Sequence, residues 1–355
     1  MKEKILSYIK ENGPVNIADY MAMCLYDPEQ GYYNSQSPFG EKGDFITAPE
    51  LTPLFGEMLG LWVADVWAQL GRPAPFNLIE LGPGRGVLAA DMLRALGKAA
   101  PACLDACHLH LVEISPRLQK IQKKHLHNAP CSISWHDSIT TTPPENAVAI
   151  GNELLDALPV RQYEKAADNH YYERLVTVQK GQLTLTLSPD PATPQPQNNL
   201  PISEHSPAME ALLESFKSHL RDGVLLLLDY GTERPDKNIS GDTLQAVRQH
   251  QFEDIFAAPG QADITWHIPF DKVADILEQD KCSLTDMGLF LTELGLPVRA
   301  EQAHRAATSD QQRAHIESAV RRLMDPNQMG RHFKVLCWQG KDGITPAGFV
   351  HAGQQ

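Results

Sequence analysis

The chain has 355 residues, of which 42% are hydrophobic, and a formal net charge of −13 at pH 7. This length allows one large or two modest domains with a buried core. The negative charge argues against a nucleic-acid partner, because affinity for nucleic acids comes chiefly from Lys and Arg side chains that neutralise phosphates. A cationic substrate suits the charge better.

Six cysteines are scattered singly, which predicts a reducing compartment and no disulfide framework. Cys103, Cys107, His108 and His110 are of metal-ligating types, but no second pair follows at zinc-binding spacing, so we expect no metal site. The first twenty residues mix Lys with Glu and Asp and show no signal or transit peptide, so we expect a cytoplasmic protein. The apolar segment 51–70 has the periodicity of an amphipathic core helix, so we expect no membrane insertion.

The N-terminal residues 1–75 are expected to form helices joined by a glycine-rich loop at 31–49. From residue 76 onward strands and helices alternate, which predicts βαβ units and a parallel sheet. The first of these elements are strand 77–81, helix 87–97, strand 108–113, helix 115–126, strand 132–135 and strand 147–151.

The second half of the chain begins with an inserted hairpin, predicted from alternating residues at 171–178 and 183–187. Six prolines make residues 188–207 a predicted loop. A continuous apolar run at 223–231 predicts a strand that is buried on both faces. The remaining predicted elements are helix 208–220, helix 271–279, strand 284–290, helix 300–323 and strand 333–338.

The most informative motif is the turn after the first strand, Glu80-Leu81-Gly82-Pro83-Gly84-Arg85-Gly86. One glycine would suffice for a turn, whereas three let a ligand approach the main chain closely. A dinucleotide site has Gly-x-Gly-x-x-Gly and an acid about 20 residues later. Here the third glycine comes one residue early, and the next strand-end acid, Glu113, lies beyond that interval. The spacing favours a cofactor other than a nicotinamide dinucleotide.

This pattern resembles motif I of class I S-adenosylmethionine methyltransferases. In such enzymes the glycine loop admits the carboxypropyl arm and sulfonium of the cofactor, and the acid that ends strand 2 accepts both ribose hydroxyls. The resemblance implies an α/β, Rossmann-like, seven-stranded sheet with an antiparallel seventh strand. It also implies that Gly82, Gly84, Gly86, Glu80 and Glu113 bind S-adenosylmethionine. Asp137, just past the third strand, is expected to meet the adenine amino group, and a solvated strand-end aspartate is the alternative.

Further motifs, in order along nearly the whole chain, resemble the MidA-like family. They are Tyr26-Asp27-Pro28, Gly31-Tyr32-Tyr33, Gly43-Asp44-Phe45-Ile46-Thr47-Ala48-Pro49-Glu50, Asn152-Glu153 with Asp156, Leu228-Asp229-Tyr230-Gly231, Ala262-Asp263-Ile264-Thr265 with His267, and Met329-Gly330 with Phe333-Lys334. Eukaryotic members of this family are mitochondrial arginine methyltransferases that help assemble respiratory complex I. The resemblance implies a protein substrate that is methylated on an arginine guanidinium.

The resemblance also implies two groups of site residues. Those expected to act on the methyl acceptor are Asp44, Glu50, Glu153, Asp156 and His267. Those expected to join the glycine loop and Glu113 at the cofactor are Thr47 and Asn152. Simpler roles stay open for several of them: helix N-terminal charge for Glu153 and Asp156, a solvated loop for Asp44 and Glu50, and a core hydrogen bond for His267.

Two domains are expected. Residues 1–75 form an N-terminal helical region with a lid loop at 40–49, and residues 76–355 form the methyltransferase domain, with insertions near 165–207 and 232–270. Two other functions are kept as alternatives: a catalytically weak assembly factor that binds a partner protein, and, less favoured, an NAD-dependent dehydrogenase. A homodimer is left open.

Overall fold

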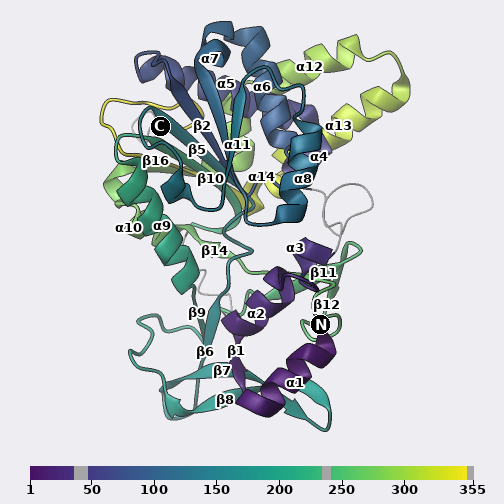
Figure 1. Ribbon diagram of the computed structural model, residues 1–355, viewed down its shortest axis with the longest axis vertical. Coiled ribbons are helices and arrows are strands. Elements are labelled where there is room, and N and C mark those ends of the chain that lie inside the picture. Colours follow the sequence, from purple (N-terminus) through teal and green to yellow (C-terminus); the bar gives the residue numbers. More distant parts are fainter. Residues whose placement is uncertain (36–46, 234–240, 350–355) are drawn as a thin grey trace. The chain divides into compact units, whose positions relative to one another are not determined.

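A computed structural model describes residues 1–35, 47–233 and 241–349 (Figure 1). These residues form two compact units. The large-sheet unit comprises residues 47–154, 213–233 and 269–349, and the small-sheet unit comprises residues 1–35, 155–212 and 241–268. The sequence placed residues 48–75 with the N-terminal helices. They belong instead to the large-sheet unit, because their apolar side chains are part of its core.

Seven strands of the large sheet follow the order β15-β16-β10-β5-β2-β3-β4. Their bounds are β2 (Phe76–Leu81), β3 (Cys107–Val112), β4 (Ser132–His136), β5 (Ala147–Asn152), β10 (Val224–Thr232), β15 (Cys282–Asp286) and β16 (Phe333–Gln339). The five strands from β10 to β4 are parallel, and β16 runs antiparallel to both of its neighbours. The predicted antiparallel last strand is therefore confirmed. The sheet has eight strands rather than seven, because the two-residue β14 (Ile268–Pro269) also pairs with β10.

Helices of the large-sheet unit follow the strands along the chain (Figure 1). They are α4 (Ala48–Leu51), α5 (Pro53–Gln69), α6 (Val87–Ala99), α7 (Pro101–Ala106), α8 (Pro116–His125), α10 (Phe270–Ile276), α11 (Met287–Glu293), α12 (Leu296–Ala306), α13 (Asp310–Met324) and α14 (Met329–His332), with 3₁₀ turns at Ile139–Thr141 and Gln279–Lys281. Helices α5 and α6 share one apolar core with the central strands, in which Trp62, Met92 and Ile150 are buried. Because parallel strands end at a common edge, this packing fixes the loops after β2, β3, β4 and β5 on one side of the sheet.

The small-sheet unit is built around a five-stranded sheet with the path β1-β7-β6-β9, in which β8 also pairs with β7. Its elements are α1 (Lys2–Asn12), β1 (Val15–Asn16), α2 (Ile17–Tyr26), α3 (Tyr32–Ser35), β6 (Arg161–Lys165), β7 (Tyr171–Gln179), β8 (Gln182–Pro191) and β9 (Ile202–His205). A three-stranded sheet joins β11 (Gln245–Arg248), β12 (Gln251–Glu253) and β13 (Asp263–Thr265). Helix α9 (Pro207–Leu220) runs across the boundary between the units at residue 212.

Residues 188–207, the proline-rich segment, were predicted to form a loop, but the structure has strands there. Strand β8 extends to Pro191, and β9 forms within the segment. The prolines of β8 are tolerated because, among the described strands, it pairs with β7 alone, which leaves one edge where a missing N–H breaks no ladder.

Two predictions near the C-terminus are wrong in their boundaries. The predicted strand 284–290 ends at Asp286, and helix α11 begins at Met287. Residues Met287, Phe290 and Leu291 are buried at helical spacing, whereas a short apolar run alone does not separate helix from strand. The predicted helix 300–323 is two helices, because Ser309 caps a new one by accepting from the Gln312 N–H at 3.2 Å.

Candidate functional site

The glycine loop lies between β2 and α6, as the sequence predicts. Gly82, Gly84 and Gly86 all have positive φ, at 60°, 52° and 80°, and Gly86 is the N-cap of α6. Left-handed backbone of this kind strains any residue that carries a Cβ. An added Cβ at Gly82 would also lie 3.1 Å from the Leu154 side chain. The loop therefore needs glycine for its shape and exposes main chain at the end of β2.

Glu80 is the buried acid of β2, with 3% of its surface exposed. Burial raises the pKa of its carboxyl to about 8, and a hydrogen bond with the Ala89 backbone opposes the shift. Its Oε2 atom is buried, and no described residue is its hydrogen-bond partner. A buried unpaired acceptor is costly, which makes this atom a candidate contact for a bound donor.

Glu113 directly follows β3 and is also buried, at 6% exposure. Its Oε1 accepts the Ser115 backbone N–H at 2.8 Å, and its Oε2 accepts from Gln122 Nε2 at 3.1 Å. Burial raises the pKa of the carboxyl, and these hydrogen bonds oppose the shift. A carboxylate oxygen has two acceptor sites, so each oxygen keeps capacity for a further donor.

Sequence reasoning missed Gln122, which is fully buried on α8. Its Nε2 also donates to the Gly84 carbonyl at 2.8 Å, and its Oε1 accepts from Trp135 Nε1 at 3.0 Å. The side chain therefore joins the glycine loop, the strand-end acid Glu113 and β4. No sequence motif contains it; the only signal is a polar residue among the inward positions of α8.

Asn152 is the last residue of β5, Glu153 directly follows it, and their side chains are in contact. Glu153 has the positive φ of 51°, which is uncommon for a residue other than glycine and costs energy, so the surrounding structure must hold it. Its Oε1 accepts from Asn152 Nδ2 at 2.9 Å and from the Ala48 N–H at 3.2 Å. Burial raises the pKa of Glu153. The Asn152 Oδ1 atom is buried and has no hydrogen-bond partner within the part of the chain that the structure describes.

Thr47 and Glu50 lie at the start of α4. Thr47 is the N-cap, and its carbonyl accepts the Glu50 N–H at 2.9 Å. The Glu50 carboxylate binds the guanidinium of Arg85 through both oxygens, with Nε to Oε1 at 2.9 Å. Glu50, predicted to act on the methyl acceptor, is thus ion-paired with the middle of the glycine loop.

Two more predicted residues belong to the small-sheet unit. Asp156 is buried, and its carbonyl accepts the Trp266 N–H at 3.3 Å. The His267 N–H donates to Thr243 Oγ1 at 2.9 Å. Tyr33 donates to Asp263 Oδ1 at 3.2 Å. Burial, together with the negative charges of the neighbouring aspartates, raises the pKa of Tyr33 well above its ordinary value.

The remaining predicted site residues are Asp44 and Asp137. Asp44 lies outside the described residues, as does most of the predicted lid loop 40–49. Asp137 follows β4 and its side chain is exposed.

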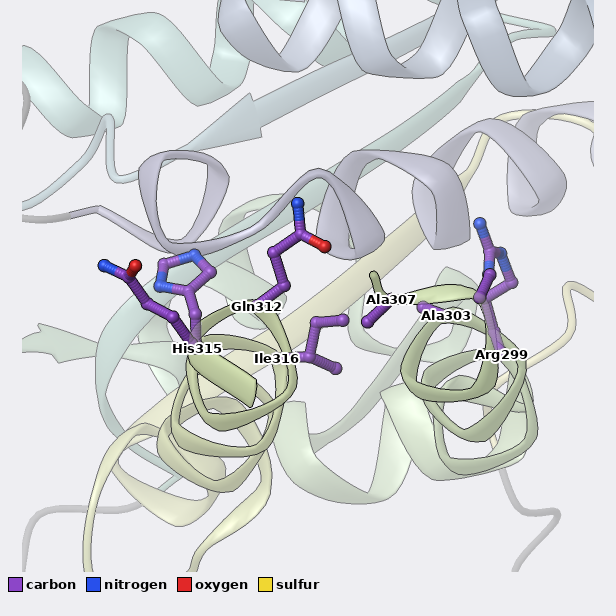
Figure 2. A pocket seen from close by; sticks show the side chains of 8 residues that line it. Arg299, Ala303, Ala307, Gln312, His315 and Ile316 are labelled. Carbon is purple, nitrogen blue, oxygen red and sulfur yellow. The ribbon is translucent and has the colours of Figure 1, made fainter. Parts of the chain in front are cut away.

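A shallow groove of about 560 Å³ runs between α12 and α13, lined by Arg299, His315 and Ile316 among others (Figure 2). None of the predicted site residues lines it. Within the described ranges, no cluster of His, Cys, Asp and Glu has an arrangement suited to a metal ion, and no helix combines the length and apolarity needed to cross a membrane.

Comparison with known proteins gives related sequences and structures. A family model for S-adenosyl-L-methionine-dependent methyltransferases matches residues 58–287. The mitochondrial protein arginine methyltransferase NDUFAF7 homolog of Drosophila melanogaster is 33% identical, over 95% of this chain and 83% of its own. Human mitochondrial NDUFAF7, also named a protein arginine methyltransferase, is 30% identical over 94% of this chain and 82% of its own.

A solved structure from Burkholderia thailandensis, bound to S-adenosyl-homocysteine, is 26% identical with a TM-score of 0.84. The match covers 99% of this chain and 94% of that chain.

These matches correct one prediction and confirm another. The relatives are mitochondrial proteins, which contradicts the cytoplasmic location expected from the mixed charges of the first twenty residues. The cofactor prediction is confirmed, because the family model covers the glycine loop, Glu113 and the segment after β5. The chain belongs to the family of S-adenosyl-L-methionine-dependent methyltransferases.

Proposed function

We propose that this methyltransferase modifies an arginine guanidinium of a protein substrate. The observation that carries the proposal is the match, over nearly the whole chain, to relatives named protein arginine methyltransferases. The acidic composition is compatible with a cationic acceptor.

The residues at the strand ends fit the cofactor. S-adenosylmethionine, when bound, supplies a methyl group on a positively charged sulfur. Its amino-acid ammonium is a donor, and the unpartnered acceptors Glu80 Oε2 and Asn152 Oδ1 end or follow neighbouring parallel strands β2 and β5. A donor bound there would remove the cost of leaving these atoms unpaired. We assign the ribose hydroxyls to Glu113, and keep the three glycines, Thr47 and Asp137 as further cofactor contacts.

The acceptor presents a chemical problem. A guanidinium stays protonated at neutral pH, so its nitrogen lone pairs are delocalised and poorly nucleophilic. Two carboxylates that clamp its planar fork would orient the reacting nitrogen and polarise charge toward the other nitrogens. As the nitrogen gains the methyl group it loses a proton, which a carboxylate accepts and passes to water.

Glu153 is the carboxylate best suited to this task among the described residues. It is held at a positive φ directly after β5, and its raised pKa favours proton uptake. Asp156, three residues later in the chain and part of the small-sheet unit, is kept as a candidate for the acceptor's contacts, together with Asp44 and His267. Glu50 would need to leave Arg85 before it could bind a substrate guanidinium. We also propose that residues 1–75 and the insertions near 165–207 and 232–270 receive the protein substrate.

The test measures formation of S-adenosylhomocysteine by purified protein with S-adenosylmethionine and an extract of the host's proteins. Glu153→Gln and Asp156→Asn should each lower turnover by about 10²–10⁴ while leaving cofactor affinity nearly intact. Glu145→Gln, an exposed glutamate before β5, is the control and should keep full turnover.

The assembly-factor alternative predicts a different result. Cofactor binding without any S-adenosylhomocysteine, in every extract tried, would favour that alternative and contradict the proposal. A titration of dialysed protein with NAD addresses the dehydrogenase alternative, and the proposal predicts no binding.

A further inference from the structure

The Gln122 side chain is fully buried between three groups from different parts of the sheet edge. Its Nε2 donates both to the Gly84 carbonyl, at 2.8 Å, and to Glu113 Oε2, at 3.1 Å. Its Oε1 accepts from Trp135 Nε1 at 3.0 Å. One amide therefore links the loop after β2, the end of β3 and strand β4.

The three partners fix the orientation of this amide. The Gly84 carbonyl and the Glu113 carboxylate can only accept, and the Trp135 indole can only donate. Turning the amide over would place acceptor against acceptor and donor against donor, so one orientation alone satisfies all three contacts. A buried network that is fully satisfied in this way is rigid and specific.

The contact with Gln122 fixes the orientation of the Glu113 carboxylate. Its Oε1 is held by the Ser115 N–H on its own turn, and its Oε2 is held by the Gln122 side chain, which comes from α8. Without Gln122, the carboxylate could rotate about its last bond, and the Gly84 carbonyl would lose its link to α8. We propose that Gln122 is a positioning residue that aims the Glu113 carboxylate at the cofactor's ribose hydroxyls and locks it to the glycine loop. This inference rests on the proposed ribose contact of Glu113.

The test compares two ligands by calorimetry: S-adenosylhomocysteine and its 2′,3′-dideoxy analogue, which lacks both ribose hydroxyls. The parent should bind S-adenosylhomocysteine at least about tenfold more tightly than the analogue, as expected for hydrogen bonds to a charged group. Gln122→Met keeps the size and removes the polar contacts. This variant should prefer S-adenosylhomocysteine over the analogue by only about threefold or less, chiefly because it binds S-adenosylhomocysteine more weakly.

Gln119→Met is the matched control. Gln119 lies on the same helix, and its Nε2 donates to the Glu113 main-chain carbonyl at 2.8 Å, not to the carboxylate. Its substitution should leave the ligand preference at the parent value.

Trp135→Phe provides a second variant should Gln122→Met fail to fold. It removes only the donor to Gln122 Oε1 at a half-buried site and does not touch Glu113. The amide then keeps its two acceptor partners but loses the donor that fixes its oxygen, so it holds the Glu113 carboxylate less firmly and the ligand preference should fall by at least about twofold.

Equal losses for both ligands in Gln122→Met, or an unchanged preference in Trp135→Phe, would show a merely structural role and overturn the inference while sparing the proposed function. If the parent binds both ligands with equal affinity, Glu113 does not bind the ribose hydroxyls, and the inference is overturned as well. A parent that binds neither ligand would contradict the proposed function as well.

Discussion

At the scale of single residues, Glu113 shows how a buried acid is kept ready for a ligand. Two internal donors hold its oxygens, and each oxygen retains acceptor capacity. The sequence placed this residue as the last of strand 108–113 by alternation, whereas the structure ends β3 at Val112 and places Glu113 directly after it. Its partners could not be predicted, because Gln122 and Trp135 come together only through the packing of α8 on the sheet.

We predict that Glu113→Ala weakens binding of S-adenosylmethionine at least tenfold, because each hydrogen bond to a charged group contributes about 1.5–3 kcal/mol. Isothermal titration calorimetry measures the change. Glu293→Ala, at an exposed position on α11, serves as the control. Unchanged affinity in Glu113→Ala would remove the ribose assignment.

The buried carboxyl of Glu80 makes the stability of the folded protein depend on pH. Burial raises its pKa from 4.5 to about 8, so between these values the folded protein binds more protons than the unfolded chain. Its contribution to stability is full below the unfolded pKa and is lost as pH rises through the folded pKa. Glu80→Gln stays neutral and keeps the shape, so the ligand-free variant should gain stability relative to the parent as pH rises.

Urea unfolding at about pH 5 and pH 8 tests this prediction, with an expected relative gain on the order of 2–4 kcal/mol for Glu80→Gln. Glu145→Gln, which is exposed, should show no such trend. If the free energy of unfolding changes with pH equally in Glu80→Gln and in the parent, the ionisation of Glu80 does not destabilise the folded state, and the prediction is wrong.

At the scale of elements, Glu57 ties three helices of the large-sheet unit together. It is buried on α5, its Oε1 pairs with Arg94 of α6, and its Oε2 lies 2.8 Å from Arg299 Nε of α12. Both guanidinium groups are about one-third exposed, at 38% and 32%, which moderates the energy of the pairs.

Glu57→Gln should therefore lower the free energy of unfolding by about 2 kcal/mol, since it removes the carboxylate that pairs with Arg299 and one of the two carboxylates that pair with Arg94. Glu301→Gln, in the exposed pair with Arg305 on α12, should cost less than about 0.5 kcal/mol. Denaturant unfolding compares the two variants, and equal losses would show that burial adds nothing to the Glu57 pairs.

The elements also show where sequence patterns stop being informative. Long alternating or continuous apolar runs, such as those of β2 and β10, predicted their strands to within about one residue. The short run at 284–290 was predicted as one strand, although only its start up to Asp286 is strand, because strand and helix patterns agree over so few residues. The sequence does contain a signal for the start of α13, because Ser309 is followed three residues later by Gln312.

At the scale of the whole molecule, the glycine spacing predicted the cofactor because backbone geometry restricts it strongly. The acceptor site was harder to predict. Its candidate residues come from segments that are distant in the chain, and two of them, Asp156 and His267, belong to the small-sheet unit. The ion pair of Glu50 with Arg85 likewise joins α4 to the glycine loop, and no local pattern announces it.

The most direct test of the central claim identifies the atom that receives the methyl group. Purified protein is incubated with isotopically labelled S-adenosylmethionine and an extract of the host's proteins, and the labelled protein is sequenced by tandem mass spectrometry. The proposed function predicts label on arginine guanidinium nitrogens, and its loss in Glu113→Ala at limiting cofactor. Label found only on lysine, on a carboxylate or on a small molecule would contradict the arginine mechanism.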